Sequence, residues 1–196
     1  MPRRRKENIE LPSLEQLAAE RERLRYKARY GRTLRSTVYV LIVVAAAAIL
    51  VATLWMPVLQ IYGSSMSPTL RDGDIVVCVK TSDFHTGDLA AFYYGNKLLV
   101  KRVICGPADW IDIDGDGHVY INGALTDEPY VQEKALGEST LEYPYQVPDE
   151  RWFLMGDNRA VSIDSRSSQV GCVAQEQIAG RIVFRVWPLN EFGPVA

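Results

Sequence analysis

One long apolar stretch and a series of short alternating stretches divide the chain into two parts. No charged residue occurs between Ser36 and Leu70, and 21 positions, 38–58, are apolar almost without interruption. At about 1.5 Å per residue, a helix of this length spans roughly the 30 Å hydrocarbon core of a bilayer. Tyr39 and Trp55 lie near its ends, where aromatic side chains suit the membrane interfaces. The pattern predicts one membrane-spanning helix.

Two other interpretations of this stretch are a buried core helix and a cleaved export signal. Four consecutive alanines lower the hydrophobicity of the stretch. No charged residue interrupts it, however, and this disfavours a core helix. Export signals have a shorter apolar region and a shorter charged lead-in than the 35 residues found here. We therefore expect an uncleaved anchor over residues 36–58.

After residue 60 the apolar positions fall into short runs rich in Val, Ile, Phe, Tyr and Trp, with Gly, Pro, Asn and Asp between them. We expect strands over residues 75–80, 88–95, 97–105, 110–113, 118–123, 151–156 and 181–187. Short strands at this spacing predict an all-β fold, an antiparallel barrel-like domain. Residues 127–150 are polar and contain three prolines, so we expect an extended surface excursion there. A helical period occurs only over residues 174–180.

Charge is distributed unevenly along the chain. Residues 1–35 carry 11 Lys/Arg against 5 Asp/Glu, and the remainder carries 11 against 19. A basic arm suits nucleic acid or an anionic membrane surface, and the apolar stretch that follows favours the membrane. The positive-inside rule then predicts a cytoplasmic segment 1–35, the anchor 36–58 and an extracytoplasmic β-rich domain 59–196.

Within the basic segment, residues 13–35 are expected to form a charged helix. Ser13 is its N-cap, and Gln16 completes a capping box. The helix lies either on the membrane surface or in solvent as a stalk.

Three cysteines, Cys78, Cys105 and Cys172, fall in the outer domain. An odd number leaves at least one thiol unpaired, and no CxxC or Cys/His spacing indicates a metal site. Cys78 and Cys105 lie in apolar runs typical of buried small side chains. Whether two of the three are paired stays open.

Three polar segments interrupt the β pattern at positions that suit chemistry. The first is GSSMSPTL at residues 63–70, and the third is GDNRAVSIDSR at residues 156–166, directly after an apolar strand. The second is Lys101-Arg102 inside the strand LLVKRVI, where alternation sends the two side chains to opposite faces. Taken singly, they also fit a linker, an edge lysine and a hydrogen-bonded loop.

Together and in this order, the three segments resemble the signature boxes of bacterial type I signal peptidases: SMxPTL, KRV and GDNRxxSxDSR. Gly73-Asp74 and the late FRVWPLN also resemble that family, and the likeness covers residues from about 36 to 190. It implies a membrane-bound serine endopeptidase that removes signal peptides from exported preproteins after small-x-small motifs. The partners that it implies are the preprotein and the lipid bilayer. It implies no metal, no cofactor and no nucleic acid.

The resemblance also assigns roles to residues. It makes Ser65 the nucleophile and Lys101 the general base, with Ser162 orienting the lysine. Structural support falls to Asp157, Arg159, Asp164 and Arg166.

The chemistry agrees with a Ser–Lys pair. A serine hydroxyl needs a base to remove its proton, and the two histidines, His85 and His118, lie outside the three segments. A lysine can act as that base if its pKa falls from about 10.4 toward roughly 8, which costs about 3 kcal/mol. Burial among apolar neighbours lowers the pKa in this direction, whereas Arg102 stays charged.

The sequence departs from the family pattern at several positions. Gly63 stands where some members carry a hydroxyl that helps to bind the oxyanion, which leaves the backbone N–H of Ser65 as the expected donor. Cys105 and Ala108 stand where glycines are common. We expect the substrate to pair with Ile61–Gly63 and Leu98–Val100, in shallow pockets formed by Leu59, Ile61, Val76, Leu99 and Val100.

Two alternatives and one misleading pattern remain. Asp112–Gly117 begins like an EF-hand loop, but its twelfth position is Gly123 instead of a bidentate Glu, so a hairpin turn is expected. A specialised maturation protease would use the same Ser–Lys chemistry, and a non-catalytic assembly factor would not need it. The preproteins that are cut and the oligomeric state stay open.

Overall fold

The computed structural model describes residues 13–195 and divides the chain into two compact units, Met1–Val51 and Ala52–Ala196. The beginning of the predicted cytoplasmic segment lies outside the described residues. These two units are defined by compactness alone. They do not test the functional boundaries that the sequence predicts at residues 35 and 58.

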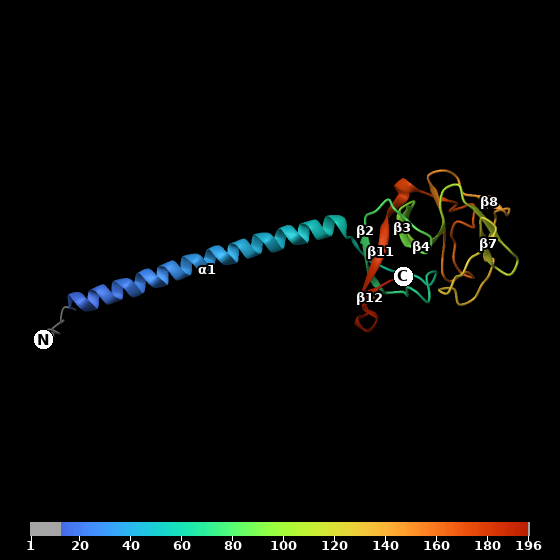
Figure 1. The fold of residues 1–196 in the computed structure, drawn as a ribbon. Helices are drawn as coiled ribbons and strands as arrows, with labels where there is room; N and C mark the ends of the chain where they lie inside the picture. Colours follow the sequence, from blue (N-terminus) through green and yellow to red (C-terminus); the bar gives the residue numbers. More distant parts are fainter. Residues whose placement is uncertain (1–12, 196) are drawn as a thin grey trace, which may run out of the picture. The chain divides into compact units, whose positions relative to one another are not determined.

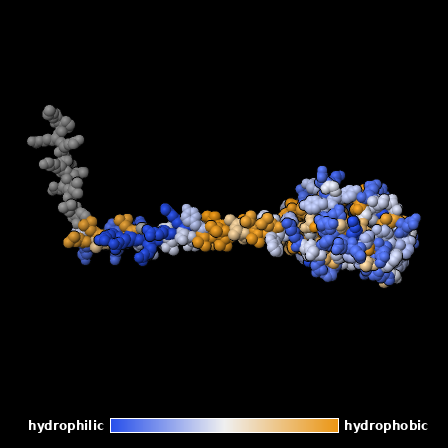
Figure 2. All heavy atoms as spheres, turned by 90° about the horizontal axis from the view of Figure 1, so that it is seen from above, coloured by the Kyte–Doolittle hydropathy of each residue, from blue (hydrophilic) through white to orange (hydrophobic). Residues whose placement is uncertain are grey.

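The N-terminal unit is built on one continuous helix, α1 (Leu14–Trp55), which joins the predicted charged helix to the predicted anchor (Figure 1). The predicted capping box is confirmed: Gln16 N–H donates to Ser13 Oγ at 3.2 Å, and Ser13 N–H donates to Gln16 Oε1 at 3.0 Å. Figure 2 shows charged side chains on the first part of the helix and apolar ones on the second. By length and composition, α1 can cross a membrane, and none of its apolar window is buried within the protein.

The C-terminal unit contains a large antiparallel sheet in the order β1-β2-β11-β3-β4-β9-β10, with β12 paired to β11. Its strands are β1 (Val58–Gln60), β2 (Ile75–Val79), β3 (Leu89–Tyr94), β4 (Lys97–Cys105), β9 (Arg151–Met155), β10 (Val173–Ala174), β11 (Ile178–Trp187) and β12 (Gly193–Pro194). Among the described residues β1 and β10 end the order, so the sheet does not close into the expected barrel.

A second antiparallel sheet has the order β7-β6-β5-β8. It consists of β5 (Trp110–Ile113), β6 (Val119–Ile121), β7 (Ala124–Leu125) and β8 (Tyr145–Gln146). Each of the seven runs predicted as strands contains one, because alternation over four or more residues is a strong signal. The remaining strands, two or three residues long, carry no detectable period.

Two other expectations are corrected. Residues 174–180 are not a helix: a 3-10 turn, η1 (Gln175–Gln177), leads directly into β11, and a second turn, η2 (Leu189–Glu191), follows that strand. Residues 127–150 consist mainly of turns, bends and irregular backbone, with one two-residue strand, Tyr145–Gln146. They are not confined to the surface as expected, since Glu128 and Val147 are buried.

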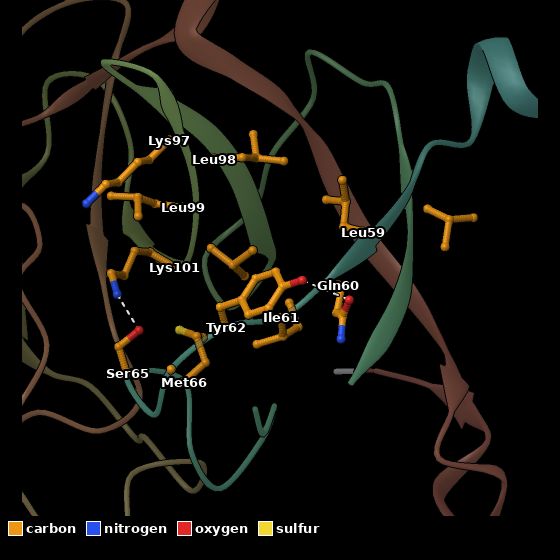
Figure 3. A pocket seen from close by; sticks show the side chains of 13 residues that line it. Leu59, Gln60, Ile61, Tyr62, Ser65, Met66, Lys97, Leu98, Leu99 and Lys101 are labelled. Atoms are coloured by element: carbon orange, nitrogen blue, oxygen red, sulfur yellow. Dashed lines mark hydrogen bonds between the residues drawn. The ribbon is translucent and has the colours of Figure 1, made fainter. Parts of the chain in front are cut away.

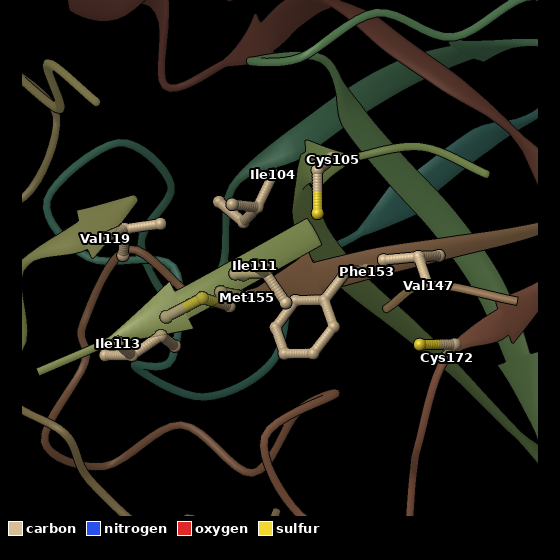
Figure 4. Close-up of a cluster of buried hydrophobic side chains, with 9 residues drawn as sticks. All are labelled: Ile104, Cys105, Ile111, Ile113, Val119, Val147, Phe153, Met155 and Cys172. Carbon is tan, nitrogen blue, oxygen red and sulfur yellow. The ribbon is translucent and has the colours of Figure 1, made fainter. Parts of the chain in front are cut away.

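One apolar cluster fills the space where β4 and β9 meet the second sheet (Figure 4). Its buried members are Ile104, Cys105, Ile111, Ile113, Val119, Val147, Phe153, Met155 and Cys172. The cluster packs against the C-terminal ends of β4 and β9 and stabilises both strands. These strands carry Lys101-Arg102 and lead into the segment 156–166.

The three cysteines are free and buried. Cys105 on β4 pairs with Phe153 on β9, and the β9–β10 register places Cys172 on the other side of Phe153. Two strand spacings, roughly 10 Å, therefore separate Cys105 from Cys172, beyond the roughly 7 Å limit for a disulfide. Burial raises the pKa of the Cys78 thiol to about 11, which keeps it protonated and unreactive.

Candidate active site

Ser65 and Lys101 come together from two separate parts of the C-terminal unit (Figure 3). Ser65 lies in the loop between β1 and β2, and Lys101 lies in the middle of β4. The Lys101 Nζ donates a hydrogen bond to Ser65 Oγ at 2.6 Å. This distance is within reach for proton transfer between a base and a nucleophile.

Lys101 is buried, with 4% of its surface exposed. Burial lowers the pKa of its ammonium from 10.5 to about 8, with the charges of Asp164 and Asp157 acting in the opposite direction and that of Arg166 adding to the decrease. An ammonium ion loses hydration in such a site, which favours the neutral amine. Near pH 7 the neutral amine is therefore the minor form of Lys101, but it is far more abundant than for an exposed lysine.

Arg102 points to the opposite face of β4, as alternation predicts. Its Nε and Nη2 donate to the two carboxylate oxygens of Asp157 at 2.9 and 2.8 Å, and its Nη1 donates to the carbonyl of Gly87 at 2.7 Å. The guanidinium also lies 3.9 Å from the centre of the Tyr130 ring. Thr69 donates to Asp157 at 2.5 Å, so this network links β4 to the loop that carries Ser65.

The loop of residues 156–166 is held by a second buried pair, Asp164 and Arg166, whose side chains are 0% exposed. Arg166 Nε donates to Asp164 Oδ1 at 2.8 Å, and its Nη2 donates to Oδ2 at 2.9 Å. Burial raises the pKa of the Asp164 carboxyl, but the bonds and the charge of Arg166 outweigh it and hold that pKa below its ordinary value. Asp164 therefore remains a carboxylate near Lys101.

Ser162 lies buried in the same loop, and its hydroxyl makes no hydrogen bond of good geometry among the described residues. It lies near enough to the Asp164 carboxyl to help lower the pKa of that group. It packs closely on Gly156, where an added Cβ would overlap the Ser162 Oγ and lie 2.5 Å from the Ser65 carbonyl oxygen. Only glycine fits at residue 156. Lys101 bonds to Ser65 and not to Ser162 in this state, so the orienting role of Ser162 stays a prediction.

A groove of about 560 Å³ runs beside Ser65 and Lys101 (Figure 3). Four of the five residues expected to form substrate pockets line it: Leu59, Ile61, Leu99 and Val100. The fifth, Val76, is not among the lining residues; it is fully buried and packs beneath the groove in an apolar cluster with Ile61, Met66 and Leu70. The groove is mainly aliphatic, with Gln60, Tyr62 and Lys97 as further lining residues.

The N-terminal half of β4, residues 97–101, has a free edge beside this groove. Residues 97–101 pair with β3 on one side, whereas pairing with β9 on the other side begins only at Arg102. Unpaired backbone groups on a strand edge can pair with an additional extended chain. The arrangement can therefore receive a peptide next to Ser65.

A group of metal-ligand side chains occurs in the turn between β5 and β6. Asp114, Asp116 and His118 bring ligand atoms within 4.8 Å of one another. Asp114 Oδ1 already accepts the backbone N–H groups of Asp116 and His118 at 3.0 and 2.9 Å. These bonds close the predicted hairpin turn and account for the cluster.

Two residues of the network escaped the sequence analysis. Glu128, fully buried, pairs with Arg159, and Tyr130 lies against Arg102. Both belong to the segment expected to be a surface excursion. Local sequence gives no signal for them, because their burial depends on arginines from other parts of the chain.

Comparisons with known proteins show the family to which the chain belongs. The family model described as "Signal peptidase, peptidase S26" matches residues 34–187. A signal peptidase I of Bacillus licheniformis is 36% identical over 165 residues, 78% of this chain and 87% of its own length. A signal peptidase I of Bacillus amyloliquefaciens is 35% identical over 77% of this chain and 86% of its own.

Two further similarities extend the comparison. A signal peptidase IB of Staphylococcus aureus strain COL is 35% identical over 67% of this chain and 78% of its own length. A crystal structure of a signal peptidase I from Enterococcus faecalis V583 covers 50% of this chain and 96% of its own, with 27% identity and a TM-score of 0.42.

Proposed function

Because the chain belongs to the peptidase S26 family and its function is the removal of signal peptides by a serine endopeptidase, we propose that Ser65 and Lys101 are its catalytic pair. The observation that carries the proposal is the 2.6 Å hydrogen bond from the Lys101 Nζ to the Ser65 Oγ, made by a buried lysine. The same bond argues against a non-catalytic assembly factor, which would need neither the contact nor the burial.

In the first half of the reaction, neutral Lys101 accepts the hydroxyl proton of Ser65 while Oγ attacks the carbonyl carbon of the scissile peptide bond. The tetrahedral intermediate then loses its amine, which takes the proton from the Lys101 ammonium. In the second half, Lys101 accepts a proton from a water molecule as that water attacks the Ser65 ester. The second tetrahedral intermediate breaks the bond to Ser65 Oγ, which takes the proton back from the Lys101 ammonium. The signal peptide leaves with a new carboxylate, and the serine hydroxyl and the neutral lysine are restored.

The negative charge on the intermediate requires hydrogen-bond donors. We assign one of them to the backbone N–H of Ser65, which does not donate to any other backbone or side-chain group of the described residues. A donor of this kind, already in place, stabilises the transition state without a cost of reorganisation.

The supporting roles follow from the contacts. Asp164 and Arg166 hold the loop that presents Ser162 toward the lysine, and Asp157 fixes Arg102 next to Lys101 in the chain. Arg159 fixes the start of the same loop by donating to the Gly156 carbonyl at 3.1 Å. Ser162, with its unpartnered buried hydroxyl, would accept or donate a bond once Lys101 turns during the reaction.

The substrate is a preprotein that lies extended along the free edge of β4 and fills the groove with small side chains. Leu59, Ile61, Leu99 and Val100 narrow the groove, which suits a small-x-small motif before the scissile bond. Backbone pairing supplies affinity without regard to sequence, and the aliphatic walls supply the selection.

The apolar part of α1 would anchor the enzyme in the cell membrane, with residues 1–35 in the cytoplasm and the catalytic unit outside. The excess of Lys and Arg before the apolar stretch supports this orientation. The lipid bilayer would then be a partner, and nucleic acid would not. Ser65 follows the last helical residue, Trp55, by only ten positions, close to where a signal peptide emerges.

The test is cleavage of a purified preprotein by the full chain in detergent. Ser65→Ala and Lys101→Ala should abolish cleavage, while the matched exposed controls Ser64→Ala and Lys80→Ala should retain it. Circular dichroism verifies that all four variants are folded. Cleavage at the wild-type rate by either of the first two variants would remove that residue from the mechanism.

A further inference from the structure

Glu128 is a carboxylate without exposed side-chain surface in a segment, residues 127–150, in which most other side chains are exposed or half-buried. Its Oε1 and Oε2 accept hydrogen bonds from Arg159 at 2.5 and 3.1 Å. The Coulomb attraction of such a pair is largely offset by the loss of hydration. The main effect of the pair is therefore to hold the Arg159 side chain in one position.

Arg159 passes this constraint to Gly156. Its Nε donates to the Gly156 carbonyl at 3.1 Å, and the N–H of Gly156 donates to Asp164 Oδ2 at 2.9 Å. Bonds on both sides of residue 156 fix its backbone at the end of β9. The carboxylate of Glu128 supplies the partner without which the Arg159 charge would be buried alone.

Gly156 is the contact between this network and the catalytic groups. The Cα of Gly156 lies so close to the Ser162 hydroxyl and the Ser65 carbonyl that an added Cβ would overlap both oxygens. Two residues further on, the N–H of Asn158 donates to the same Ser65 carbonyl at 3.1 Å. A shift of the backbone at residue 156 therefore moves Ser65 relative to Ser162.

We propose that Glu128 is a positioning residue: through Arg159 and Gly156 it sets the placement of Ser65 against Ser162 and Lys101. The proposal rests on the catalytic pair proposed above. Glu128 does not line the groove, so its effect should fall on kcat and leave KM unchanged. Displacements of about 1 Å between reacting groups are enough to slow an enzyme on the order of a hundredfold.

The experiment separates positioning from stability with two variants of the full chain in detergent. Glu128→Gln keeps the shape but leaves Arg159 buried without a charge partner. The double variant Glu128→Leu/Arg159→Met replaces the pair by apolar side chains of similar volume, a change that is often neutral or stabilising for a buried ion pair. It also removes the Arg159 bond to the Gly156 carbonyl. Glu133→Gln, an exposed residue of the same segment, is the control.

For both variants we expect kcat to fall on the order of tenfold to a hundredfold, with KM within about twofold of wild type, on a short peptide substrate. The melting temperature should fall in Glu128→Gln and recover in the double variant, while kcat should stay low in both. The midpoint of the rise of kcat/KM with pH should also move upward, because a displaced Ser65 leaves Lys101 more open to water, which favours its ammonium form. Glu133→Gln should match wild type in each measurement.

A double variant with recovered melting temperature, wild-type kcat and an unchanged pH midpoint would overturn the proposal, since Glu128 would then serve stability alone. A change in KM with constant kcat would overturn it as well. Ser65→Ala, assayed in parallel, keeps the two hypotheses apart: cleavage by Ser65→Ala contradicts the catalytic pair, whereas full activity of the double variant contradicts only the role of Glu128.

Discussion

At the residue scale, the backbone of Gly63 favours glycine at the position where some family members carry a hydroxyl. Its φ is +87°, in the region that favours glycine, and its N–H donates to Asp72 Oδ1 at 2.7 Å. No atom lies within 4 Å of the position that a Cβ would take there, so the obstacle to a side chain is the backbone conformation and not space. The sequence indicated the missing hydroxyl, but its physical reason appears only in the turn.

We predict that Gly63→Ser destabilises the protein by about 1–2 kcal/mol, the cost of a left-handed conformation for a residue with a side chain. Gly63→Ala should cost the same, since the strain does not depend on the hydroxyl. The free energy of unfolding in urea, monitored by tryptophan fluorescence, measures both. Equal stability of wild type and the two variants would contradict the argument.

The Ser65–Lys101 pair was predicted through the family resemblance of the three motifs, and the strand pattern agreed with it. Alternation along β4 sends Lys101 and Arg102 to opposite faces, and only one of them could be a base. The partner of Arg102 was not assigned, because strand alternation does not indicate which carboxylate of the loop after β9 it meets. Glu128 was missed because its segment has no strand or helix period, and only the fold brings Arg159 beside it.

At the element scale, the loop after β9 is ordered by charge instead of apolar packing. Arg102, Arg159 and Arg166 have side chains at most 2% exposed, and each is paired with a carboxylate that is equally buried. Such pairs fix direction as well as distance, because guanidinium and carboxylate meet in a plane. The strands could be predicted from their alternation, whereas this loop, without any period, could be identified only by its motif.

We predict that Asp164→Asn lowers the free energy of unfolding by about 3–5 kcal/mol near pH 7, since it leaves Arg166 buried without a charge partner. Because the folded pKa of Asp164 lies below the unfolded value of about 3.9, its contribution is complete above that pH and is lost as the pH falls toward the folded value. The difference from wild type should therefore shrink below about pH 4.

Urea unfolding at several pH values checks this dependence, with the exposed Asp149→Asn as control. A constant difference between pH 7 and pH 3 would show that Asp164 does not act through its ionised form.

At the scale of the whole molecule, most of α1 and all strands of the described residues belong to different compact units. The strands, both sheets and the groove all belong to residues after Ala52, and no strand comes from the described part of the helical unit. Cleavage chemistry should therefore survive without the helix, while access to a signal peptide held in a bilayer should depend on it. Confining both partners to one membrane raises their effective concentration.

We predict that removing residues 1–51 leaves kcat/KM for a short soluble peptide within several-fold of the full chain. Cleavage of a preprotein inserted in lipid vesicles should fall on the order of a hundredfold, the size of a typical gain from effective concentration. Both rates are measured at equal enzyme concentration. Equal loss on the two substrates would instead indicate that the helix supports the catalytic unit itself.

The pH dependence of kcat/KM for a short peptide tests the central claim, that buried Lys101 is the base for Ser65, most directly. Lys101 must be neutral to accept a proton, so activity should rise with pH and reach half its plateau near the lysine pKa of about 8. Lys101→Ala should be inactive over the whole range. A rise centred near pH 6.5, the ordinary range of histidine, or activity that stays constant down to pH 6, would contradict the account.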